Sequence, residues 1–178
     1  VFNCVSCGTK GNIWQFSKNF NIDLRDYGLS INPIDKSFAE DCHQHLQEHP
    51  ERRLECWNEF IVKELKVGWN KKVRRIVFPI FNTQGDIVNV KQHKGPQITG
   101  AHATLYPLNH INKYCKEYIV ICEGEKDAVS LLSQGIPAIT STGGALTVPK
   151  NISLLNIFKS IYLCFDNDDT GRKGAEKW

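Results

Sequence analysis

The chain has 178 residues, of which 41% are hydrophobic and 23% charged, as is typical of a folded protein with its own core. No segment approaches the roughly 20 apolar residues that a membrane-spanning helix needs, and the first residues lack the pattern of a signal peptide. The net charge of +3 is too small to indicate a nucleic-acid-binding protein by itself. An odd number of cysteines, seven, favours a reducing, cytoplasmic compartment over a disulfide framework.

The first third of the chain is polar and interrupted. Cys4 and Cys7 have the spacing of a metal-binding knuckle, which we expect to lead into a strand at 13–16. Residues 21–34 have the composition of a linker. We then expect two short helices, at 37–48 and 51–65, separated by Pro50. Because the chain begins at Val1 and ends at Trp178, inside a predicted helix, we expect it to be part of a longer protein.

The periodicity changes after residue 70. Residues 75–82 and 87–94 have the composition and alternation of β-strands, and the segment between them, 82–86, is rich in turn-forming residues. Together they predict a β-hairpin, followed by a Gly-Pro loop at 95–100.

The last third alternates between strands and helices. Residues 118–122 form a short apolar run that suits a strand buried on both faces, and Gly135 lies where a helix C-terminus favours glycine. The expected order is strand 118–122, helix 125–134, strand 137–141, a short helix 151–158 and strand 161–165. This order predicts a parallel α/β sheet.

Acidic residues follow two of these strands directly. Glu123 comes after the first strand and Asp166 after the last, with Asp168 two residues further and Asp127 one helical turn after Glu123. The carboxyl ends of parallel strands meet at one sheet edge, where ligands bind. Clustered carboxylates repel one another unless a cation lies among them, and their oxygens suit Mg²⁺ or Mn²⁺. The alternative is that they are solvated acids favoured by helix N-termini.

The motifs around these acids resemble a known domain. VICEGEKDA (120–128) and FDNDDTG (165–171) are similar to the Toprim domain, which bacterial-type DNA primases, type IA and II topoisomerases and some nucleases share. Residues 2–16 resemble the second half of the primase zinc ribbon, and 75–95 resemble the strand pair that precedes the Toprim domain in primases. This order is that of a primase and is closest to the phage and mitochondrial primase–helicase type.

The resemblance implies a fold and a division of the chain. The fold would be α/β, with a Rossmann-like parallel Toprim sheet preceded by a β-hairpin subdomain, a helical linker and half of a zinc ribbon. The expected segments are the zinc-ribbon half at 1–20, linker and short helices at 21–72, the β-rich part of the catalytic core at 73–116, and a truncated Toprim domain at 117–178.

The resemblance also implies an activity. It implies synthesis of short RNA primers on single-stranded DNA, with Mg²⁺ (or Mn²⁺) as cofactor and nucleoside triphosphates, the nascent primer and a replicative helicase, in cis or in trans, as partners. Glu123 would be the general base or a metal ligand, Asp166 and Asp168 would hold Mg²⁺, and Asp127 would assist. Lys91 would contact nucleotide phosphate or template. The setting would be the cytoplasm of a bacterial or phage-infected cell, without a membrane partner.

A basic run lies between the linker and the hairpin. Lys71, Lys72, Arg74 and Arg75 would contact template phosphates without discriminating sequence, or they form a solvated charged surface.

The cysteines and histidines leave further alternatives. Cys4 and Cys7 would supply two of four Zn²⁺ ligands, the other two being expected before Val1 in the full-length protein. A second group could bind metal, although exposed histidines and core thiols are the simpler interpretation: Cys42, His43, His45, His49 and Cys56. Cys115, Cys122 and Cys164 lie in or beside apolar runs and are expected to be buried free thiols.

Two other functions fit the same motifs. The first is a Toprim nuclease or topoisomerase-like enzyme, which would cleave DNA rather than synthesise a primer. The second is a non-catalytic module that binds single-stranded DNA, although such a module has no need for clustered acids.

Overall fold

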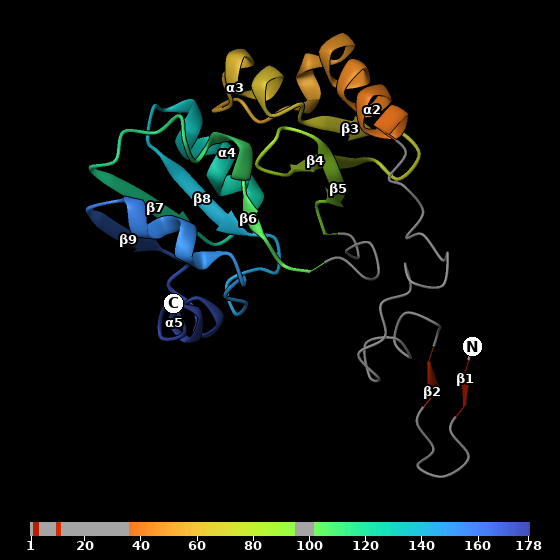
Figure 1. Ribbon diagram of the computed structural model, residues 1–178. Helices are drawn as coiled ribbons and strands as arrows, with labels where there is room; N and C mark the ends of the chain where they lie inside the picture. The colour runs from red at the N-terminus through yellow and green to blue at the C-terminus, as the bar shows by residue number, and fades with distance from the viewer. Residues whose placement is uncertain (1, 4–9, 12–35, 95–101) are drawn as a thin grey trace.

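The computed structural model describes residues 2–3, 10–11, 36–94 and 102–178, which contain two larger sheets, the helices around them and a further sheet of two short strands (Figure 1). The first sheet is antiparallel, with strand order β3-β4-β5. The second has the order β6-β8-β7-β9, in which β7 is parallel to β8 and β9, and β6 is antiparallel to β8. The first sheet comprises β3 (Gly68–Asn70), β4 (Arg75–Phe81) and β5 (Ile87–Gln92). The second comprises β6 (Leu105–Tyr106), β7 (Tyr118–Cys122), β8 (Ala138–Ser141) and β9 (Ser160–Cys164).

The helices of the described residues are short. They are α2 (Lys36–Glu48), α3 (Glu59–Glu64), α4 (Glu125–Ser133) and α5 (Asp169–Ala175), with 3-10 turns η2 (Pro50–Arg52), η3 (Leu108–His110) and η4 (Ile152–Ile157). None of them combines the length and the apolar character that crossing a bilayer requires. At the N-terminus, β1 (Phe2–Asn3) pairs antiparallel with β2 (Lys10–Gly11).

The predicted α/β part is confirmed. The expected strands and the expected helix 125–134 are present within one or two residues of their predicted ends, and the expected helix 151–158 is the 3-10 turn η4. Gly135 has φ of +77° just after α4, and the amides of Gly135 and Ile136 donate to the carbonyls of Leu132 and Leu131. This double hydrogen bond is the Schellman ending that glycine favours.

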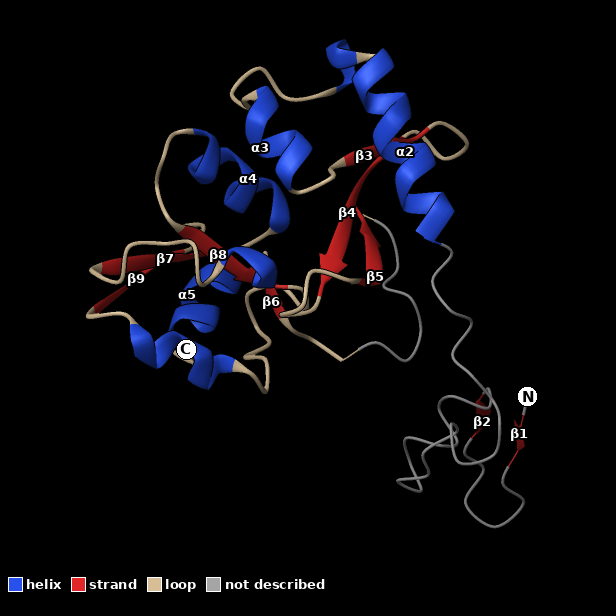
Figure 2. Cartoon of the chain, turned by 45° about the horizontal axis from the view of Figure 1, so that its top comes forward, coloured by secondary structure: helices blue, strands red, loops and turns tan. Residues whose placement is uncertain are grey.

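The parallel sheet has a core on each face. Ile119, Ile121 and Ile139 pack on one face with residues of η4, such as Leu155. Cys122 and Ala138 face the other side, where the apolar residues of α4 join Trp57, Val62 and Phe78 in the largest buried cluster. The period-2 alternation along β7 therefore divides its side chains between two cores. Figure 2 shows α4 between this sheet and the region of α3.

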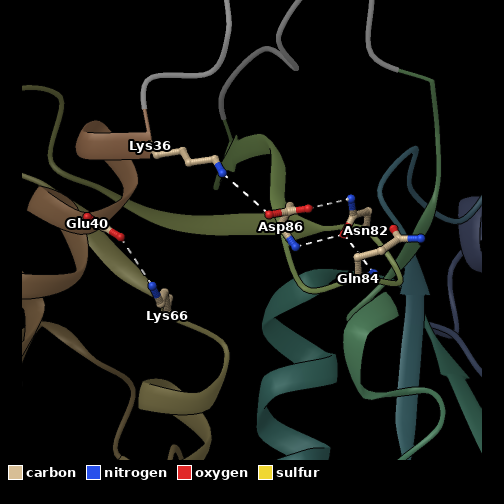
Figure 3. A network of polar contacts seen from close by, with 6 residues as sticks. All are labelled: Lys36, Glu40, Lys66, Asn82, Gln84 and Asp86. Carbon is tan, nitrogen blue, oxygen red and sulfur yellow. Dashed lines mark hydrogen bonds and ion pairs between the residues drawn. The ribbon is translucent and has the colours of Figure 1, made fainter.

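The antiparallel sheet packs against α2. Gly68 of β3 lies so close to the backbone of Cys42 and His43 that a Cβ atom there would overlap it. At the predicted hairpin turn, the side-chain oxygen of Asn82 accepts hydrogen bonds from the amides of Gln84 and Asp86, at 3.0 and 2.9 Å (Figure 3). Lys36 forms an exposed ion pair with Asp86 at 3.7 Å, a contact that adds little stability in water.

Three expectations about local structure are wrong, and the antiparallel edge strand β6 was not predicted. The predicted helix 51–65 is instead η2, a connection with a turn at 55–56, and α3, because the Asn58 side chain caps a new helix by accepting from the amide of Ile61 at 2.8 Å. The strand β3 was not predicted. Cys122 is buried, as expected, but Cys115 and Cys164 are exposed. Cys164 lies on β9, an edge strand whose five residues are all exposed because neither of its faces is fully covered by the described elements.

The structure leaves some expectations untested. The predicted strand at 13–16, the linker 21–34 and the loop 95–100 lie outside the described residues.

Candidate active site

Two of the predicted acids meet at the carboxyl edge of the parallel sheet. In the β7–β9 register Cys122 lies opposite Cys164, so the two strands end at the same level, with Glu123 one residue and Asp166 two residues beyond this pair. The amide of Asp166 donates a hydrogen bond to Oε2 of Glu123 at 3.1 Å. Glu123 is half-buried, whereas Asp166 is exposed. We call Glu123, Asp127, Asp166 and Asp168 the acidic edge.

The other two acids of the acidic edge cap helices. Oδ1 of Asp168 accepts from the amide of Gly171 at 2.8 Å, in the first turn of α5. Oδ2 of Asp127 accepts from the amide of Gly124 at 3.1 Å, at the start of α4. Both acids are exposed. Each carboxylate therefore uses one oxygen for a local cap, and its exposure leaves the other oxygen accessible to a ligand.

Gly171 sets the distance between α5 and the loop before it. A Cβ atom at this position would overlap the carbonyl oxygen of Asp166. Only glycine allows the helix to start so close to the acidic residues, so this glycine positions Asp166 and Asp168 relative to the sheet.

The acidic edge suits a hard cation chemically. No ion pair within the described residues reaches any of its four carboxylates. Mg²⁺ takes oxygen ligands, keeps several waters and needs only one or two carboxylates, so one or two of the four carboxylates at this edge would suffice. No three of these four carboxylates bring their oxygen atoms within 4.8 Å of one another. Within the described residues, the one group of three or more candidate ligands that meets this distance lies on α2.

Lys91 of β5 connects the two sheets. Its Nζ is 2.7 Å from Oε1 of Glu125 in α4 and donates to the carbonyl oxygen of Thr142 at 2.9 Å. Glu125 is only 6% exposed, and burial raises its pKa while Lys91 acts in the opposite direction. We call Lys91, Glu125 and the Thr142 carbonyl the Lys91 junction. The ammonium of the predicted phosphate-binding lysine is therefore directed at α4 and the end of β8.

Glu125 was not among the residues that the sequence predicted to lie at the site. It lies in the same EGEKD segment as Glu123 and Asp127, and nothing in the one-dimensional pattern distinguishes its buried position.

The basic run lies on a different sheet from the acidic edge. Lys71, Lys72 and Arg74 are exposed on the turn between β3 and β4, and Arg75 is half-buried at the start of β4. Lys71 and Lys72 line a cavity beside α2.

The candidate zinc ligands Cys4 and Cys7 lie outside the described residues, in the segment between the paired strands β1 and β2. The second group does not converge as a whole. Cys42 is buried, the ring of His43 contacts the Val67 carbonyl at 2.7 Å, and the Cys56 thiol lies 3.5 Å from Ser130 Oγ. His45 and His49 do share a helix face, with ring centroids 4.5 Å apart.

Comparisons with known proteins agree with this arrangement. Residues 120–178 match a family model described as Toprim-like. The chain is 31% identical over 121 residues to a DNA primase of Pseudomonas aeruginosa, a match that covers 57% of this chain and 18% of that protein. The chain therefore spans about a fifth of the length of this curated relative.

Solved structures show the same fold. The zinc-binding and RNA polymerase domains of the Aquifex aeolicus primase superpose with a TM-score of 0.61 at 19% identity, covering 99% of this chain and 62% of that one. The primase fragment of the bacteriophage T7 primase-helicase protein superposes with a TM-score of 0.53 at 22% identity, covering 67% and 55%. The chain thus carries a Toprim-like domain, has DNA primase homologues and has the fold of primase domains.

Proposed function

We propose that this chain is the part of a DNA primase that carries the metal-binding acids, and that the protein synthesises short RNA primers on single-stranded DNA. The observation that carries the proposal is the meeting of Glu123 and Asp166 at the carboxyl edge of the parallel sheet, through a 3.1 Å hydrogen bond. Homology to DNA primases over about 120 residues supports it.

The acidic edge has a defined part in this reaction. Glu123, Asp166 and Asp168 would hold Mg²⁺ (or Mn²⁺), and Glu123 alternatively accepts the proton of the attacking 3′-hydroxyl. Asp127 assists from the first turn of α4. The metal would neutralise the phosphate charge that develops during nucleotidyl transfer. The protein contributes positioning, because the β7–β9 register and Gly171 fix where the carboxylates lie.

The remaining partners follow from the same proposal. Lys71, Lys72, Arg74 and Arg75 would bind template phosphates, with a salt-dependent affinity. Lys91 would act near the nucleotide phosphates from the Lys91 junction. Cys4 and Cys7 would hold Zn²⁺ together with two further ligands. We propose the division into segments 1–20, 21–72, 73–116 and 117–178 for these tasks, and a replicative helicase, in cis or in trans, as partner in the cytoplasm of a bacterial or phage-infected cell.

The test is primer synthesis by the full-length protein on a single-stranded template, with labelled nucleoside triphosphates and Mg²⁺. Short oligoribonucleotides should form with the wild type and disappear with Glu123→Gln and with Asp166→Asn. Glu117→Gln is the matched control, because Glu117 is an exposed acid just before the opposite end of β7, and its one ion pair within the described residues is with the exposed Lys159. It should retain activity.

Two outcomes would contradict the proposal. DNA cleavage that requires the same acids, without primer synthesis, would indicate a Toprim nuclease or topoisomerase-like enzyme. DNA binding that is independent of Mg²⁺, with neither activity, would indicate a binding module that is not catalytic.

A further inference from the structure

A group of ligand-type side chains lies at the C-terminal end of α2, apart from the acidic edge. It consists of His45, Glu48 and His49, and the three ligand atoms all lie within 4.8 Å of one another. His45 is half-buried and the other two are exposed. Within the described residues, no other set of three or more histidine, cysteine, aspartate or glutamate side chains meets this criterion.

The helix produces this convergence. Residues three and four positions apart lie on one face of an α-helix, so His45, Glu48 and His49 point the same way. The amide of His49 still bonds to the carbonyl of His45 at 3.1 Å, which continues the helical turn to the last of the three. The order His-x-x-Glu-His is also one in which two histidines of a helix bind zinc. In addition, the C-terminal end of a helix carries partial negative charge that favours a cation.

Neighbouring side chains orient two members of the group, His49 and Glu48. Oε1 of Glu51 lies 3.4 Å from Nδ1 of His49, a contact that orients the ring and leaves Nε2 available, as carboxylates do for metal-bound histidines. Gln44 donates a hydrogen bond to Oε1 of Glu48 at 2.9 Å. This bond fixes the carboxylate and leaves its second oxygen available to a metal ion.

An open cavity of about 340 Å³ lies beside the group. His45 and Glu48 line it, together with Asp41 and Cys42 of α2 and with Lys71 and Lys72 of the β3–β4 turn. The cavity gives room for water or another ligand to complete a coordination shell. Cys42 is not counted among the ligands, because its side chain is buried and is not part of the group whose ligand atoms converge.

We propose that His45, Glu48 and His49 bind one divalent transition-metal ion of the Zn²⁺ type. Two imidazoles and one carboxylate are a nitrogen-rich set, which suits Zn²⁺, Ni²⁺ or Cu²⁺ and not Mg²⁺. The site is separate from the acidic edge, and it does not depend on the proposed function.

The experiment is a calorimetric titration of the chain with Zn²⁺ in excess Mg²⁺, which competes with Zn²⁺ for the carboxylates of the acidic edge. The chain carries Cys4→Ser and Cys7→Ser, so that these cysteines do not contribute. We expect one Zn²⁺ per chain, and binding at least tenfold weaker for His45→Gln and for His49→Gln. Glu48→Gln should weaken it less, since it removes a charge but keeps an oxygen. His102→Gln, at an exposed histidine outside the group, is the matched control and should bind as before.

A second measurement protects against misfolding of a variant. Cu²⁺ bound to the same chain should give an electron paramagnetic resonance spectrum with coupling to imidazole nitrogens, and this coupling should decrease in either histidine variant while the far-ultraviolet circular dichroism is unchanged. Zn²⁺ binding that is absent, or that is equally strong in the double variant His45→Gln/His49→Gln, would overturn the proposal.

Discussion

Two glutamates separated by one residue have opposite environments in this protein. Glu123, the first residue after β7, is half-buried and accepts a hydrogen bond from the amide of Asp166. Glu125, at the start of α4, is 6% exposed and lies 2.7 Å from the ammonium of Lys91. The first belongs to the open acidic edge and the second to the closed Lys91 junction. The difference shows that acids of one short segment can be divided between a candidate site and a structural contact by burial alone.

A comparison of Glu123→Gln with Glu125→Gln, for which we expect the largest change, tests the division between the acidic edge and the Lys91 junction. Glu123→Gln should reduce primer synthesis by about a thousandfold, the range expected for loss of a general base, and leave the free energy of unfolding nearly unchanged. Glu125→Gln should do the reverse: it should lower the free energy of unfolding, because a mostly buried lysine loses its partner, and reduce the rate much less. The two variants are compared in one primer assay and one urea titration. Similar losses of rate in both would mean that the two glutamates are not separated in function.

The next effect concerns the Lys91 junction. Lys91→Met leaves the Glu125 carboxylate buried without a counterion and should lower the free energy of unfolding by about 3 kcal/mol at neutral pH. Burial already raises the pKa of Glu125 in the folded protein, and the loss of Lys91 raises it further. Protonation then stabilises the folded state of the variant, so the deficit should shrink as the pH falls toward about 4.3, the ordinary glutamate value.

The control for this prediction is the double variant Lys91→Met/Glu125→Gln, in which no charge is left buried. It should recover much of the stability at neutral pH and lose the added pH dependence. A deficit in Lys91→Met that is the same at all pH values would show that packing of the lysine stem, not the charge of Glu125, is responsible.

A smaller effect is expected at Gly171, on the side of the acidic edge. Gly171→Ala places a Cβ atom against the Asp166 carbonyl, so α5 must move, at a cost of about 1–3 kcal/mol in stability. The Mg²⁺ concentration needed for half-maximal activity should also rise, because Asp166 and Asp168 lose their spacing. Lys173→Ala, at an exposed position in the same helix, is the control and should change neither quantity.

The smallest effect is expected at His110. Among the described residues, this buried base has no strong partner of opposite charge, whereas Glu125 has Lys91. Burial lowers the pKa of His110, with Lys113 adding to this and Glu64 opposing it. The folded protein therefore resists protonation, and the stability due to the neutral ring is present above the unfolded value of about 6.5 and is lost as the pH falls below it. Denaturation at about pH 7.5 and about pH 5.5 should show a smaller difference in His110→Gln than in the wild type. An unchanged difference would assign the pH dependence to other groups.

Several elements could be predicted because their signals are local. The β4–β5 hairpin followed from alternating residues on either side of a turn, and the order of β7, α4, β8 and β9 followed from apolar runs separated by one amphipathic segment. The helix predicted at 51–65 failed because a single side chain, Asn58, starts a new helix within a composition that favours one continuous helix. The strand β3 was missed because three residues carry too little pattern; pairing with β4 and contact with α2 define it.

The apolar pattern indicates where each strand ends and the strand–helix alternation indicates its direction, so the amino-acid sequence was enough to predict that Glu123 and Asp166 leave parallel strands at one edge. Three other features could be learned from the folded chain alone: these strands are neighbours in the sheet, Glu125 is buried against Lys91, and Cys164 is exposed on an edge strand. The physical reason is that burial and pairing depend on which segments distant in the chain come together. A carboxylate has the same letter in the sequence whether its neighbour is water or a lysine from another sheet.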